Sequence, residues 1–97
     1  MKFRKKPVVI DAVQLTPDLA VRVLMRETKA PFGLHISGDY HPGRREVHRA
    51  WASIETLEGV MRAELNDWII KGVKGELYPV KDEIFKQTYE AVDATQG

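Results

Sequence analysis

The chain has 97 residues and a mass of 11.1 kDa, with 43% hydrophobic and 30% charged residues, a formal net charge of +1 and no cysteine. This length predicts one domain, residues 1–97, with a modest core. The lack of cysteine excludes disulfides, thiolate metal sites and cysteine nucleophiles. The small net charge argues against a surface built for nucleic acid or for an anionic membrane.

The first segment, "MKFRKKPVVIDAVQL", joins a basic start to a short apolar run. Asp11 and Gln14 interrupt that run and no small-residue cleavage site follows, so we do not interpret it as a signal peptide. No apolar segment reaches the length of a membrane span. We expect no membrane partner, a cytoplasmic location, and a strand over residues 8–15 with apolar side chains on both faces.

A helix is predicted over residues 16–29, "TPDLAVRVLMRETK". Thr16 suits the N-cap, Pro17 suits the first turn, and Asp18 favours the positive end of the helix dipole. Apolar residues recur at helical spacing, which indicates one amphipathic helix. Pro31 ends it.

Residues 30–50 interrupt this regular pattern with three glycines and two prolines, and "LHI" is the only strand-like fragment in them. We predict a long irregular loop here, and long loops in small domains are usually functional or mobile.

From Trp51 onward the pattern indicates an antiparallel meander up to residue 80, with turns at Glu58-Gly59 and Lys74-Gly75. A short helix over "KDEIFKQ", a last strand over "TYEAV" and a frayed tail at residues 93–97 complete the chain. The predicted fold class is α+β: mostly antiparallel sheet, with the first and last strands joined to it, one amphipathic helix and a short C-terminal helix.

The 30–50 segment and its border supply the candidate binding residues. Tyr40, Arg44, Arg45, Arg49 and Trp51 combine aromatic and guanidinium groups, which dominate protein-binding hot spots. The same groups could line a pocket for a small anionic ligand. Nucleic acid is disfavoured, because a run of acidic residues follows directly.

A metal site is a weaker candidate. His35, Asp39 and His41 have ligand types that suit zinc, but the intervening glycine leaves their geometry open. The carboxylates lie beside turns or on solvent faces, and no nucleophile motif stands out. We therefore expect no enzyme activity and no cofactor, with a metal-dependent enzyme as the least favoured option.

Three segments resemble a widespread group of small phage and prophage proteins: "MKFRKKPVVIDAVQL", "TLEGVMRAELNDWIIKGVKGELYPV" and "KDEIFKQTYEAV". Relatives in that group usually carry Pro-Gly-Asp-Trp where this chain has Leu65-Asn66-Asp67-Trp68, and Asn66 can adopt the left-handed conformation that glycine would take. The resemblance implies a phage-encoded accessory protein in a bacterial host cell. It implies no activity and no catalytic residues.

These observations lead to three alternatives for function. The first is a non-catalytic binding module for a host or phage protein, with a contact patch around Tyr40 and Trp51. The second is a protein that binds or sequesters a nucleotide-type ligand in counter-defence, with homo-oligomer formation left open. The third is the metal-dependent enzyme.

Overall fold

The computed structural model describes residues 1–4 and 6–92, and its strands and helices confirm a single α+β domain that is mostly antiparallel sheet. In chain order the elements are β1 (Asp11–Gln14), α1 (Pro17–Leu24), the 3-10 turn η1 (Pro31–Gly33), β2 (His35–His41), β3 (Glu46–Thr56), β4 (Gly59–Glu64), β5 (Trp68–Lys71), β6 (Leu77–Val80) and α2 (Asp82–Thr88).

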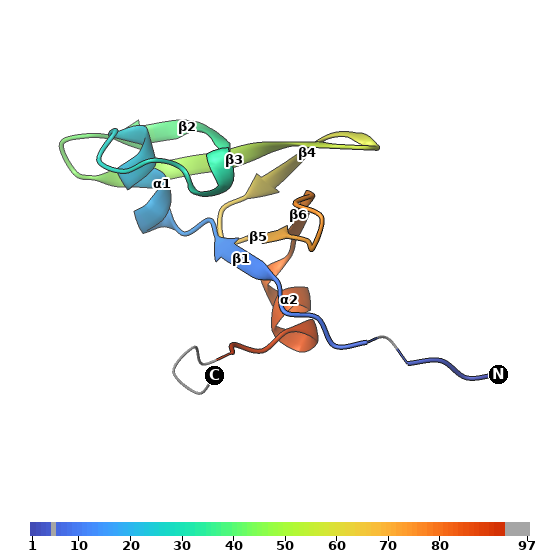
Figure 1. Ribbon diagram of the computed structural model, residues 1–97. Helices are drawn as coiled ribbons and strands as arrows, with labels where there is room; N and C mark the ends of the chain where they lie inside the picture. The colour runs from blue at the N-terminus through green and yellow to red at the C-terminus, as the bar shows by residue number, and fades with distance from the viewer. Residues whose placement is uncertain (5, 93–97) are drawn as a thin grey trace.

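The strands form two three-stranded sheets (Figure 1) instead of the single predicted sheet: one has the order β2-β3-β4 and the other β1-β5-β6. The sheets separate at the turn after β4, where Asn66 takes a left-handed φ of 73°. This turn redirects the chain, and β5 pairs with β1 from Asp11↔Lys71 to Gln14↔Trp68. The first strand is predicted over residues 8–15, and in the structure its residues 8–10 do not pair with β5.

The main core lies between α1 and one face of the β2-β3-β4 sheet. Alternation along β3 turns Ala50, Ala52 and Ile54 inward, and Ala63 of β4 joins them. These alanines and Ala20 of α1 are fully buried. Small side chains let the helix approach the sheet closely, so a small domain still achieves a close-packed interior.

Helix α1 begins as predicted and ends earlier than residue 29. The hydroxyl of Thr16 accepts a hydrogen bond from the backbone N–H of Leu19 at 3.1 Å. Arg26 then adopts φ 60°, and the N–H of Glu27 bonds back to the carbonyl of Arg22 at 2.8 Å. This is a C-terminal capping arrangement of the kind that usually uses glycine.

The prediction of an irregular loop over residues 30–50 is wrong. β2 and the first half of β3 form a long hairpin there, in register from His35↔Ser53 to His41↔Glu46. A bulge between Asp39 and Tyr40 leaves His48 without a Cα partner in the register. The local sequence is a weak strand former, and the pairing with the apolar β3 makes β2 a strand.

The C-terminal end also differs from the prediction. Helix α2 is present, but no strand follows it in residues 89–92. Instead Tyr89 stacks on Phe85 with ring centroids 5.1 Å apart, and Phe85 stacks on Trp68 at 3.9 Å. The predicted tail, residues 93–97, lies outside the described residues.

Candidate functional site

The side of the β2-β3-β4 sheet that faces away from α1 carries the candidate site. Ala50 and Ala52 are buried on the helix side, so Arg49, Trp51 and Ser53 project from the opposite side. The strand registers place side chains of β2 and β4 beside them. We call this surface the Trp51 face; it comprises His35, Ser37, Asp39, Arg49, Trp51, Ser53, Glu55, Val60, Arg62 and Glu64.

Trp51 is half-buried between two arginines. The Cζ atom of Arg49 lies 5.0 Å from the centroid of the Trp51 ring, and that of Arg62 lies 4.3 Å from it. Both distances are within the range of cation–π attraction. Glu64, directly opposite Trp51, lies 3.8 Å from the Nε atom of Arg62. The side chain of Trp51 is therefore bordered by charged groups of both signs.

Arg62 was not among the residues predicted from sequence. Its position follows from the turn at Leu57-Glu58: Thr56 pairs with Gly59, so Ser53 pairs with Arg62 and Arg62 lies diagonally across from Trp51. The predicted turn at Glu58-Gly59 is one residue later than the observed turn, so counting outward from it sets Ser53 opposite Glu64 and misses Arg62.

Tyr40 lies on the opposite side of the sheet from Trp51. It pairs with Val47, which packs against the core, and it is 37% exposed. The bulge shifts the register by one residue between Asp39 and Tyr40. The predicted patch around Tyr40 and Trp51 is therefore not one continuous surface.

Arg44 and Arg45 lie in the turn between β2 and β3. Arg45 forms a two-point ion pair with Glu27, with its Nη2 2.7 Å from Oε1. This hydrogen-bonded guanidinium lowers the pKa of the Glu27 carboxyl. The N–H of Arg44 donates to Nδ1 of His41 at 3.2 Å. Of the predicted arginines, only Arg49 reaches Trp51.

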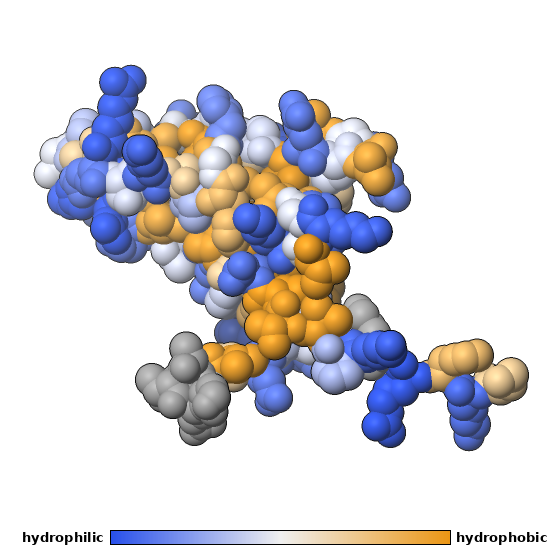
Figure 2. Space-filling view, in the orientation of Figure 1, coloured by the Kyte–Doolittle hydropathy of each residue, from blue (hydrophilic) through white to orange (hydrophobic). Residues whose placement is uncertain are grey.

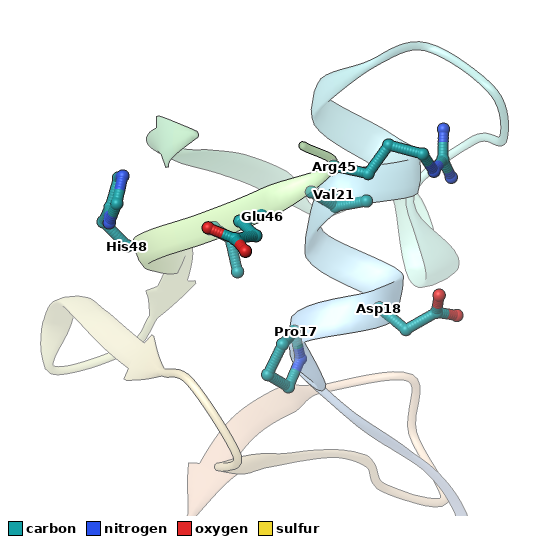
Figure 3. Close-up of a pocket in the computed structure, with 7 residues that line it drawn as sticks. Pro17, Asp18, Val21, Arg45, Glu46 and His48 are labelled. Carbon is teal, nitrogen blue, oxygen red and sulfur yellow. The ribbon is translucent and has the colours of Figure 1, made fainter. Parts of the chain in front are cut away.

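A cavity of about 410 Å³ lies beside α1 (Figure 3). Its walls are formed by Pro17, Asp18, Val21, Arg45, Glu46, Val47 and His48. The carboxylates of Asp18 and Glu46 offset the Arg45 guanidinium, which also forms an ion pair with Glu27. Neither Arg44 nor Arg49 lines this cavity, and no Phe, Tyr or Trp does. It is not the arginine-lined anion pocket that the sequence suggested.

The three candidate metal ligands all lie on β2. His35 and Asp39 are four residues apart on one strand, which separates their Cα atoms by roughly 13 Å at the usual rise. Donor atoms sharing one zinc ion lie about 2 Å from it, so a common centre needs a closer arrangement. Within residues 1–4 and 6–92, no three His, Asp or Glu side chains are grouped to hold an ion.

Comparison with protein-family models, with curated protein sequences and with solved structures finds no match to this chain. The similarity to small phage proteins therefore stays an expectation. In the described part of the chain, neither helix has the length and apolar character needed to cross a membrane.

Proposed function

We propose that this protein is a non-catalytic binding module that contacts a protein partner through the Trp51 face. The observation that carries the proposal is the placement of Trp51, held between Arg49 and Arg62 on the side of the sheet that α1 leaves uncovered. Tryptophan and arginine are the residues most enriched at the centre of protein interfaces.

The surroundings of Trp51 support a protein partner over a nucleotide. Asp39, Glu55 and Glu64 lie on the same face as the two arginines. A half-buried aromatic within a rim of both charge signs has the anatomy of a protein interface. A base could stack on the indole only by displacing a guanidinium already close to the ring.

Quantitative capture from a lysate of phage-infected bacteria, followed by titration of the purified partner, tests the proposal. Trp51→Ala is expected to weaken binding by roughly 30-fold or more, the usual effect of removing a hot-spot residue. Arg62→Ala is expected to weaken it by a smaller factor.

Tyr40→Ala is the matched control, because Tyr40 is a partly exposed aromatic on the other side of the same sheet. It should bind as the unmodified protein does. Equal loss for Tyr40→Ala and Trp51→Ala would contradict the assignment of this face. If cyclic or adenosine nucleotides raise the melting temperature of the protein but not that of Trp51→Ala, the ligand of the Trp51 face is a nucleotide and not a protein.

A further inference from the structure

The outer edge of β2 is an open edge of the larger sheet. β2 pairs with β3 on one side, and no other strand of the described chain pairs with it. Beyond the sheet ladders, no backbone hydrogen bond between described residues involves residues 35–41. An open edge presents a row of unpaired N–H and C=O groups, which favours pairing with another strand.

The other edges are less suited to pairing. β6 contains Pro79, which has no N–H to donate, and β4 lies against β6. β1 is only four residues long. β2 has seven residues and contains neither proline nor lysine, two of the residues that commonly protect an edge.

We propose that β2 pairs antiparallel with β2 of a second copy, with the two-fold axis at Ser37. The ladder with β3 is regular from His35 to Asp39 and shifts immediately afterwards, so Ser37 is the midpoint of the regular segment. Pairing about this midpoint matches the whole regular segment with itself.

This register is complementary in hydrogen bonding. It sets His35 of one copy opposite Asp39 of the second copy, twice, and sets the two Ser37 residues opposite each other. Asp39 belongs to none of the ion pairs within the described residues. A hydrogen-bond donor facing a carboxylate and two facing hydroxyls are favourable across strands, whereas two facing carboxylates are not.

The other registers that keep the faces matched are poorer. An axis at Asp39 would set two carboxylates opposite each other, and an axis at Gly38 would set His35 opposite His41 of the second copy. With the axis at Ser37, the opposite side of the sheet places Ile36 against Gly38 of the second copy, where there is no side chain to obstruct it. Of the axes at Ser37, Gly38 and Asp39, the axis at Ser37 suits both sides of the sheet best.

The dimer would contain one continuous six-stranded sheet. The two-fold axis runs perpendicular to the sheet, so both Trp51 faces lie on the same side. This inference does not rest on the proposed function, because its evidence is the β2 edge. If both hold, the assembly is bivalent for its partner.

Sedimentation and engineered cysteines test the dimer in the full chain. The expected species has twice the 11.1 kDa mass of the chain, with a Kd of about 10–100 µM because the contact is small. Ser37→Cys should form an intermolecular disulfide under mild oxidation, since residues facing across the axis have Cα atoms within disulfide range.

Ser53→Cys is the matched control. Ser53 is a half-buried serine on the same face, but it lies on the central strand β3 opposite His35, roughly 20 Å from its equivalent in the dimer at normal strand spacing and rise. It should not cross-link. The background chain contains no cysteine, so each variant has a single thiol.

A charge exchange tests the register. His35→Asp sets two carboxylates opposite each other and should raise the dimer Kd at least tenfold. The double variant His35→Asp/Asp39→Lys sets a carboxylate opposite an ammonium group and should recover the dimer. A chain still monomeric at about 1 mM, cross-linking of Ser53→Cys equal to that of Ser37→Cys, or failure of the double variant to recover would each overturn the proposal.

Discussion

Asp67 illustrates how a single polar side chain organises this fold. Its carboxylate is 6% exposed, accepts a hydrogen bond from the backbone N–H of Glu64 at 2.8 Å, and lies 3.0 Å from the ammonium of Lys81. A buried carboxylate is tolerated when its oxygens have such partners. It ties the end of β4 to the chain between β6 and α2.

Asp67→Ala should lower the free energy of unfolding by about 1–3 kcal/mol, because a partly buried N–H loses its acceptor. Urea denaturation measures this change. Lys81→Met is the control: its ammonium side chain is 57% exposed, so its loss should cost less than about 1 kcal/mol. Equal losses of unfolding free energy in the two variants would show that Asp67 stabilises the fold through the ion pair and not through the backbone hydrogen bond.

At the scale of elements, the turn between β4 and β5 decides how the two sheets are joined. The N–H of Asn66 donates to the carbonyl of Leu15 at 2.7 Å, and the N–H of Leu15 donates to the carbonyl of Asp67 at 2.9 Å. Leu15 is 1% exposed and connects β1 to α1. The turn is therefore fixed on both sides by backbone hydrogen bonds.

Asn66→Ala should destabilise the protein by about 1–2 kcal/mol, because the left-handed φ of 73° disfavours a β-carbon. Asn66→Gly should keep the free energy of unfolding within about 0.5 kcal/mol of the unmodified value, since glycine adopts this conformation readily. Urea denaturation of the two variants side by side checks both values. Similar stability of the alanine and glycine variants would mean that the turn relaxes.

At the scale of the whole molecule, the N-terminal residues extend away from the body (Figure 1). The Cα radius of gyration is 15.3 Å, above the value of about 12.5 Å for a compact chain of this length. Phe3 is 88% exposed and Val9 75%. Figure 2 shows a mixture of polar and apolar side chains over the larger sheet and a continuous apolar area around α2.

Deletion of residues 2–8 should change the free energy of unfolding by less than about 0.5 kcal/mol, because residues 2–4 and 6–8 are exposed and belong to no strand or helix of the described structure. Small-angle scattering should give a smaller radius of gyration. A deletion that continues through Gln14 removes β1 and should destabilise the protein markedly. Marked destabilisation by the shorter deletion would show that the segment packs against the body in solution.

Helix capping, turns and the alternation of side chains along a strand are set by a few neighbouring residues, so they can be predicted from the sequence. The N-cap at Thr16, the left-handed conformation of Asn66 and a turn that includes Lys74 and Gly75 agree with prediction. The inward alternation of Ala52 and Ile54 does as well. The first turn of the meander lies at Leu57-Glu58, one residue before the predicted Glu58-Gly59. Capping, turn formation and side-chain alternation act over a few positions, so the sequence alone was sufficient for them and for the α+β class.

Tertiary structure decided what depends on distant pairing. The polar, glycine-containing β2 becomes a strand only because β3 pairs with it, and β5 separates from β4 because β1 supplies a partner. Within the hairpins, the bulge after Asp39 separates Tyr40 from Trp51, and the position of the turn at Leu57-Glu58 brings Arg62 to the indole. A shift of one residue moves a side chain to the other face. Residue patterns along one strand do not specify where a bulge or a turn makes that shift, because it depends on how the two paired strands fit together.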